Sequence, residues 1–195
     1  MKFLDIFPTT IFLEEINNLN LESYQEHVKN LNLNSSEKSG SYTTSSNILE
    51  NSLFQKLKYV ILNRSSTYID ELGFNYESLQ ISNSWGNILN KNEIIPRHSH
   101  ANSYVSGCFY LTEGSPIQFY NPLHQKYTFS ATSKDNVGFR GLKDYKITPK
   151  KGMLIIFPSW IDHTALPSET NNRISIAFNI IPKGNFGWNT AQINL

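Results

Sequence analysis

Short β-prone segments separated by turn residues fill the chain from residue 76 onward, and they constrain the fold more than any other feature. β-branched and aromatic residues dominate these segments, which is typical of strands. No βαβ spacing connects them, so they predict an antiparallel sandwich or barrel rather than a parallel sheet. The expected strands cover residues 78–89, 103–111, 117–120, 144–147, 153–157 and 173–181.

Residues 1–75 carry the helical signals, so we expect a mainly β protein with N-terminal helices. One amphipathic helix is indicated by three- and four-residue steps between Leu21, Tyr24, Val28 and Leu31. A longer helix is expected over residues 52–72, a β-prone edge segment over 3–12, and a polar loop over 34–46. We expect one domain over 1–195, with residues 1–75 supporting a β core at 76–181 and a tail at 182–195.

Composition excludes several classes of protein. The chain has 39% hydrophobic and 17% charged residues, a composition that fits neither a disordered nor a membrane-spanning protein. The formal net charge of +1 gives no reason to expect nucleic acid or a membrane as a partner. A single cysteine, Cys108, excludes an intrachain disulfide and fits a reducing compartment. With no signal-peptide pattern either, the sequence predicts a cytoplasmic protein.

Three of the five histidines lie in the β-rich half in a pattern that suits a metal. His98 and His100 are two residues apart, so in an extended segment their imidazoles project from one face. His163 follows 63 residues later, just after an expected strand. Such a pair and a distant third ligand can hold a metal on one side and leave the other side open. The motif by itself is short, and surface histidines are the other interpretation.

Arg173 strengthens the metal-site interpretation. It lies ten residues after His163 and opens the strand 173–179, in which alternation places Arg173 and Ser175 on one face. A guanidinium inside a barrel is costly unless an anion meets it. Its planar fork matches a carboxylate, and Ser175 offers a further hydrogen bond. The sequence therefore predicts an anion site beside the three imidazoles.

Four co-linear segments carry a family resemblance: PRHSH (96–100), SGCFYL (106–111), LIIFPSWIDHTALP (154–167) and RISIAFN (173–179). They resemble the prolyl-hydroxylase-like 2-oxoglutarate/Fe(II)-dependent oxygenases, and most of all an uncharacterised group from bacteria and their phages. The resemblance covers about residues 76–181. It implies a double-stranded β-helix of the jelly-roll or cupin type, with Fe(II) as cofactor and 2-oxoglutarate as cosubstrate.

The resemblance also implies individual roles. His98 would be the first metal ligand, His163 the distal histidine, and Arg173 the partner of the far carboxylate of 2-oxoglutarate. Tyr110 falls where the group often has a tyrosine that binds the same carboxylate, and Asn87 would face the pocket. We expect Phe157 and Trp160 to pack beneath His163.

His100 departs from the family pattern, which has Asp or Glu at this place. If His100 binds the metal, the site has three neutral ligands and keeps the full charge of Fe(II). If its ring turns outward, Asn102, a nearby carboxylate or water would fill the position. Zinc also suits three imidazoles with an open position.

The sequence favours an oxygenase that couples decarboxylation of 2-oxoglutarate to succinate with substrate oxidation. A cupin-like three-histidine enzyme that does not use 2-oxoglutarate is one alternative, and a non-catalytic binding barrel is another. O₂ would be the second small-molecule cosubstrate, the primary substrate is peptidyl or a small molecule, and a homodimer stays open. We expect residues 34–46 and 121–143 to shape the substrate entrance.

Overall fold

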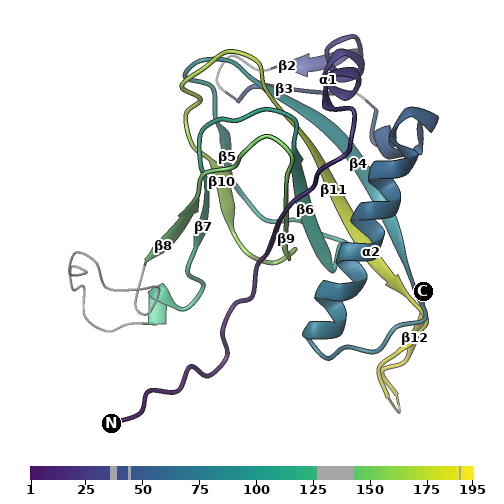
Figure 1. Ribbon diagram of the computed structural model, residues 1–195. Helices are drawn as coiled ribbons and strands as arrows, with labels where there is room; N and C mark the ends of the chain where they lie inside the picture. The colour runs from purple at the N-terminus through teal and green to yellow at the C-terminus, as the bar shows by residue number, and fades with distance from the viewer. Residues whose placement is uncertain (36–38, 44, 127–142, 189) are drawn as a thin grey trace.

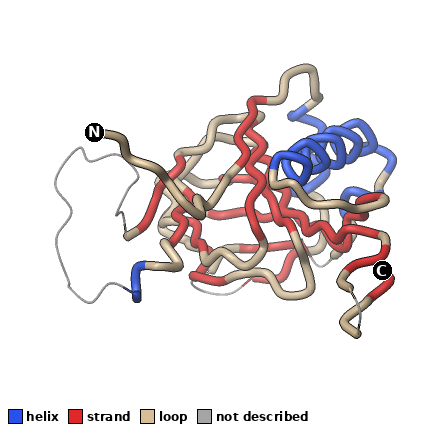
Figure 2. Tube along the Cα trace, turned by 90° about the horizontal axis from the view of Figure 1, so that it is seen from below, coloured by secondary structure: helices blue, strands red, loops and turns tan. Residues whose placement is uncertain are grey.

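A computed structural model describes residues 1–35, 39–43, 45–126, 143–188 and 190–195. Two antiparallel sheets dominate it, and the two α-helices lie on one side of the larger sheet (Figures 1 and 2). This arrangement confirms the mainly β fold with N-terminal helices and a double-stranded β-helix core. In the described part of the chain, no helix combines the length and hydrophobicity needed to span a bilayer.

The larger sheet has seven strands in the order β1-β9-β6-β11-β4-β3-β2. Three of them come from the N-terminal part of the chain, so that part contributes to the sheet as well as to the helices. The strands are β1 (Phe12–Glu15), β2 (Leu33–Ser35), β3 (Ser41–Thr43), β4 (Ser78–Leu89), β6 (Val105–Tyr110), β9 (Met153–Pro158) and β11 (Arg173–Lys183).

The smaller sheet has four strands in the order β5-β10-β7-β8. It packs against the larger sheet through a second core cluster built around Phe119, Phe157 and Ile161. Its strands are β5 (Ile95–His98), β7 (Ile117–Tyr120), β8 (Asp144–Ile147) and β10 (His163–Ala165). A two-stranded hairpin, β12 (Asn185–Phe186) and β13 (Ile193–Asn194), completes the C-terminal end.

Two α-helices cover the outer face of the larger sheet (Figure 1). Helix α1 (Leu21–Lys29) begins where the Asn20 side chain accepts a hydrogen bond from the Ser23 amide, an N-cap. Helix α2 (Gln55–Glu71) buries Leu57 and Ile61 against the sheet. Three short 3₁₀ turns are η1 (Ile48–Glu50), η2 (Ser52–Phe54) and η3 (His124–Lys126).

Strand β11 shows how one sequence pattern serves both sides of the larger sheet. Ile174, Ile176 and Phe178 are fully buried in the core beneath the helices. Arg173 and Ser175 alternate with them and face the space between the two sheets. Because both faces are buried, the strand reads as an almost continuous apolar run interrupted only by residues that face this inner space.

Several local predictions were wrong. The segment 3–11 contains no strand, and β1 begins only at Phe12. The expected loop at 34–46 contains strand β3 and the end of β2, which pair as a hairpin at the sheet edge. Strands β5 and β10 were not predicted, because they are short and take their pairing from the tertiary fold. Most of the expected loop 121–143 lies outside the described residues.

The packing of α2 on the sheet predicts that replacing Leu57 destabilises the protein more than replacing Leu53. Leu57 is fully buried in this core, whereas Leu53 is 38% exposed. We expect Leu57→Ala to lower the free energy of unfolding by about 2–5 kcal/mol, because it leaves a cavity. Urea denaturation followed by circular dichroism measures this, with Leu53→Ala as the matched control. Equal losses in the two variants would contradict the proposed role of α2 packing.

Candidate metal and cosubstrate site

Two neighbouring strands of the smaller sheet bring His98 and His163 together. His98 ends β5 and His163 begins β10, and the two residues are direct partners in the antiparallel register. Their ring centroids lie 4.3 Å apart. The two residues are 65 positions apart in sequence, and a single strand pair brings them together.

Backbone carbonyls fix the orientation of both rings. His98 Nδ1 lies 2.7 Å from the Pro96 carbonyl oxygen, and His163 Nδ1 lies 3.0 Å from the Ile161 carbonyl oxygen. A carbonyl can only accept, so in each ring Nδ1–H donates and Nε2 keeps a free lone pair. Metal-binding histidines are commonly held in this way, with the second ring nitrogen fixed by an outer partner.

His100 lies beyond the end of β5, but its ring still joins the other two. Its backbone N–H donates to the Ser159 carbonyl at 2.9 Å, which ties this segment to the turn after β9. The His100 ring centroid lies 5.1 Å from that of His98 and 5.1 Å from that of His163. The three candidate ligand atoms all lie within 4.8 Å of one another. His100 therefore points inward, while Asn102 is exposed.

The surroundings keep the imidazoles of His100 and His163 neutral. Burial, followed by the neighbouring His98, lowers the pKa of His100 to about 4. The same causes, in the same order, lower the pKa of His163 to about 3. Neutral imidazole is the form that binds a metal, so both rings are ready to act as ligands at pH 7 without losing a proton.

Arg173 lines the same inner space as the three histidines. It is only 1% exposed, and its guanidinium carbon lies over the Tyr110 ring at 5.0 Å from the centroid. One terminal nitrogen donates to the Ser115 carbonyl at 3.3 Å, whereas Nε has no hydrogen-bond partner in the described structure. None of the described carboxylates pairs with it. A buried cation in this state is costly, so the site is prepared for an anion.

Polar groups from three adjacent strands surround the guanidinium. Ser175 on β11 is the register partner of Asn87 on β4 and of Tyr110 on β6. The Ser175 hydroxyl is buried and has no hydrogen-bond partner among the described residues. Burial raises the pKa of the Tyr110 hydroxyl, which therefore stays protonated and able to donate. These groups form a row of hydrogen-bonding side chains beside Arg173.

A cavity of about 60 Å³ connects the three histidines with Arg173 and its polar neighbours. The three histidines and Arg173 all line it, together with Asn87, Tyr110 and Ser175, so every residue predicted for the site faces this one space.

Phe157 packs against His163 with 4.7 Å between ring centroids, as expected. The prediction for Trp160 was wrong: it is 56% exposed, because the chain turns outward after Pro158. Cys108 lines the cavity too.

The sequence interpretation missed several supporting residues. Arg97 and Asp162 form an ion pair at 2.6 Å, and each directly precedes a histidine of the site. Gly114 makes room for Arg173, since a Cβ there would lie 2.5 Å from the Arg173 Cγ. Trp85 lines the cavity and lies 5.8 Å from the His100 ring. Of these residues, only Trp85 could have been found from the sequence. It lies two residues before Asn87 on the same strand, so both side chains point to the same face.

Comparison with solved structures supports the fold. The chain is similar to a Pseudomonas putida prolyl-4-hydroxylase, with 13% identity, a TM-score of 0.62, and coverage of 90% of this chain and 94% of that one. It is also similar to HygX from Streptomyces hygroscopicus with nickel and 2-oxoglutarate bound (14% identity, TM-score 0.57, coverage 93% and 86%). A third similar structure is the viral collagen prolyl hydroxylase from Paramecium Bursaria Chlorella virus-1 in a 2-oxoglutarate complex. Its identity is 14%, the TM-score is 0.56, and the match covers 87% of this chain and 94% of that one.

Comparison with curated sequences finds no match. Residues 83–179, however, match the family model described as "Putative 2OG-Fe(II) oxygenase". The matched segment runs from the middle of β4 to the middle of β11 and contains all three histidines and Arg173. From the matched family and the shared fold, this chain belongs to the 2-oxoglutarate/Fe(II)-dependent oxygenase superfamily.

Proposed function

We propose that this oxygenase is a hydroxylase that binds Fe(II) through His98, His100 and His163 and anchors 2-oxoglutarate through Arg173. One observation carries the proposal. Three converging imidazoles and a buried guanidinium without an anionic partner line the same cavity. A small dianion in this cavity could contact a metal with one end and the arginine with the other.

The donor set fits Fe(II). Imidazole nitrogen is a good ligand for divalent iron, and three ligands from one side leave positions for cosubstrate and O₂. The carbonyls of Pro96 and Ile161 hold the rings of His98 and His163 with Nε2 free. When bound, the iron centre supplies O₂ activation: O₂, 2-oxoglutarate and a substrate C–H group give succinate, CO₂ and a substrate hydroxyl.

The other end of the cavity fits the far carboxylate of 2-oxoglutarate. Arg173 Nε and the Ser175 hydroxyl are buried and unpartnered in the described structure, so both can donate to an arriving carboxylate. The Tyr110 hydroxyl is a third donor beside them. Asn87 lies next to Ser175 in register and supplies an amide. This row would hold the cosubstrate in one orientation.

Charge balance explains why His100 is compatible with this chemistry. Three neutral ligands leave the full charge of Fe(II) in the cavity, and Arg173 adds a further positive charge. The dianion neutralises most of this charge in a site from which water is largely excluded. We therefore expect 2-oxoglutarate to bind more tightly here than in a site where a carboxylate ligand cancels part of the metal charge.

Apolar side chains form the remaining walls of the cavity. Ile117, Phe157 and Ala165 line it beside the histidines, and Ala177 lines it beside Ser175. Such walls offer no hydrogen bonds to water and strengthen the electrostatic contacts of the polar groups. Their role is to protect the reacting groups while the polar row orients the cosubstrate.

The two alternatives fit less well. A three-histidine enzyme that does not use 2-oxoglutarate would have Arg173 turned away or paired with a protein carboxylate. Instead, Arg173 lines the cavity and pairs with no described carboxylate. A non-catalytic barrel would give histidines that do not converge, whereas their ligand atoms lie within 4.8 Å of one another. A cytoplasmic location and a homodimer stay predictions.

Metal binding tests the ligand set directly. We expect anaerobic Fe(II) titration to give one tight site, which His98→Ala and His163→Ala each weaken by more than the ~10–100-fold typical of outer partners. His27, on helix α1, provides the control, and His27→Ala should bind iron normally. Unchanged iron affinity in both cavity variants would rule out these ligands.

Arg173→Met tests cosubstrate recognition. We expect 2-oxoglutarate affinity to fall at least about 100-fold with Fe(II) binding retained, because a buried charge-assisted carboxylate contact of about 3 kcal/mol or more is lost. Calorimetry on the metal-loaded protein measures both affinities.

The same variant should be more stable than the parent without ligand, by about 1–4 kcal/mol, since an unpaired buried cation has been replaced by an apolar side chain. Weaker 2-oxoglutarate binding together with a large loss of stability would instead indicate a structural role for Arg173.

His100→Asp tests the charge argument. The variant restores the carboxylate that related enzymes carry, so we expect it to bind Fe(II). Its 2-oxoglutarate affinity should fall, because the ligand cancels part of the metal charge. His100→Ala is the comparison, and it should lose iron affinity. A tighter 2-oxoglutarate complex in His100→Asp would show that the neutral ligand set does not favour the dianion.

A further inference from the structure

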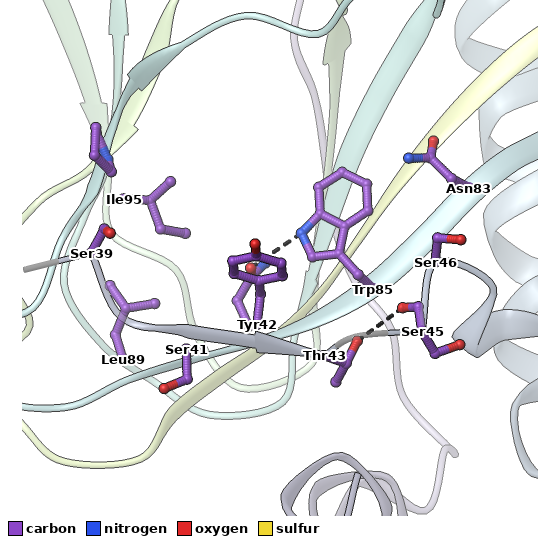
Figure 3. Close-up of a pocket in the computed structure, with 12 residues that line it drawn as sticks. Ser39, Ser41, Tyr42, Thr43, Ser45, Ser46, Asn83, Trp85, Leu89 and Ile95 are labelled. Atoms are coloured by element: carbon purple, nitrogen blue, oxygen red, sulfur yellow. Dashed lines mark hydrogen bonds between the residues drawn. The ribbon is translucent and has the colours of Figure 1, made fainter. Parts of the chain in front are cut away.

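A second and larger pocket adjoins the metal cavity. It has a volume of about 450 Å³, within the ~300–1,000 Å³ that small-molecule sites occupy. Trp85, Asn87 and Ile95 line both spaces, so a ligand in the outer pocket lies next to the metal cavity. Figure 3 shows the outer pocket, with Trp85 and Ile95 on either side of Tyr42.

The described lining of this outer pocket is uncharged and combines apolar surface with polar side chains. None of the twelve described residues that line it is acidic, basic or a histidine. An ion buried here would find no counter-charge among them, which is unfavourable. Serine, threonine and asparagine dominate instead, and they both donate and accept hydrogen bonds. The lining therefore favours a neutral ligand that has both apolar surface and hydrogen-bonding groups.

Two aromatic side chains and two amides give the pocket its shape. Asn83, Trp85 and Asn87 alternate along β4 and face the same side, and Tyr42 on β3 is the register partner of Asn87. The Asn87 Oδ1 accepts from the Trp85 indole at 3.1 Å. The amide nitrogens of Asn83 and Asn87 make no hydrogen bond in the described structure and are free to donate. Flat aromatic surfaces beside free amides suit a ring with an apolar face and a polar edge.

The backbone around the pocket is not available to a peptide. Strand β3 is hydrogen-bonded to β2 on one side and to β4 on the other. Across the pocket, β5 is an edge strand, but Pro96 has no N–H to offer. The carbonyls of Ile95 and Pro96 already accept hydrogen bonds from Thr164 and His98. Few backbone groups are therefore left for a peptide that would add as a strand, and recognition depends mainly on side chains.

We infer that the outer pocket binds the primary substrate and that this substrate is a neutral, hydroxyl-rich ring such as a glycoside or cyclitol. The inference rests on the proposed function for the reaction, but it assigns the substrate class from the pocket alone. Tyr42 and Trp85 pack on the apolar face of the ring, and the Asn83 amide donates to its hydroxyl groups. Because Trp85 also lies beside His100, a ring held on its indole is presented to the metal cavity.

The Trp85 indole N–H signal in NMR of the full-length, ¹⁵N-indole-labelled protein reports on this pocket. Trp160 and Trp188 are exposed and lie outside the pocket lining, so their signals act as internal references. The probes are methyl glucosides, methyl galactosides and myo-inositol. Glucosamine and glucose 6-phosphate are the charged analogues, and an acetylated, amidated proline-alanine peptide represents the peptide class.

We expect at least one neutral ring to shift the Trp85 signal saturably and to bind about tenfold or more tightly than the charged analogues, a difference of about 1.4 kcal/mol. Tyr42→Ala and Asn83→Ala should weaken this binding at least about fivefold. The matched control is Tyr59→Ala, since Tyr59 is an exposed tyrosine on α2 that should not affect binding.

Two separate titrations distinguish failure of this inference from failure of the proposed function. Calorimetric 2-oxoglutarate binding tests the cosubstrate site, and the Trp85 shift can also be followed in metal-free protein. If 2-oxoglutarate binds but no neutral ring shifts Trp85, the substrate class is wrong. A stronger shift from the peptide or a charged analogue would also overturn it. If neutral rings bind but 2-oxoglutarate does not, the pocket assignment stands and the oxygenase mechanism fails.

Discussion

Strand β11 runs between β4 and β6 in the larger sheet, and its burial on both faces constrains the rest of the structure. Its apolar face anchors the helices, so its other face must point between the two sheets. Arg173 is on that second face and is buried without an anionic partner in the described structure. The same pairing that stabilises the core therefore creates a buried positive charge that a carboxylate can satisfy.

The smaller sheet supplies the metal end of the site by a different route. Strands β5 and β10 are short, and their pairing sets His98 opposite His163. The Arg97–Asp162 ion pair joins the residues just before these histidines. It is partly exposed, so its contribution to stability is small, and its value lies in fixing the relative position of the two strands. Rigid strand ends and short backbone contacts thus hold the imidazoles ready for the metal.

In the proposed mechanism, the inner cavity recognises its ligand by charge and the outer pocket recognises its ligand by shape. The inner cavity concentrates positive charge and has donors without partners, which suits a dianion. The outer pocket has no charged lining residue among those described and uses aromatic and amide groups. Trp85 and Asn87 line both pockets, so a ligand in one pocket lies next to a ligand in the other. Substrate selection can then act through neutral recognition without competing for the cosubstrate's counter-ions.

The sequence alone predicted most strands of the β core and the residues that line the inner cavity. β-Branched and aromatic composition between turn residues identified β4, β6, β7, β8, β9 and β11. Alternation then placed Arg173 and Ser175 on one face, because that information is local to the strand. Only the tertiary structure decided that His100 turns inward, that Trp160 turns outward and that β3 walls a second pocket. Those outcomes depend on pairing between segments distant in sequence, and residues such as 95–98 or 163–165 carry too few side chains to specify a partner by themselves.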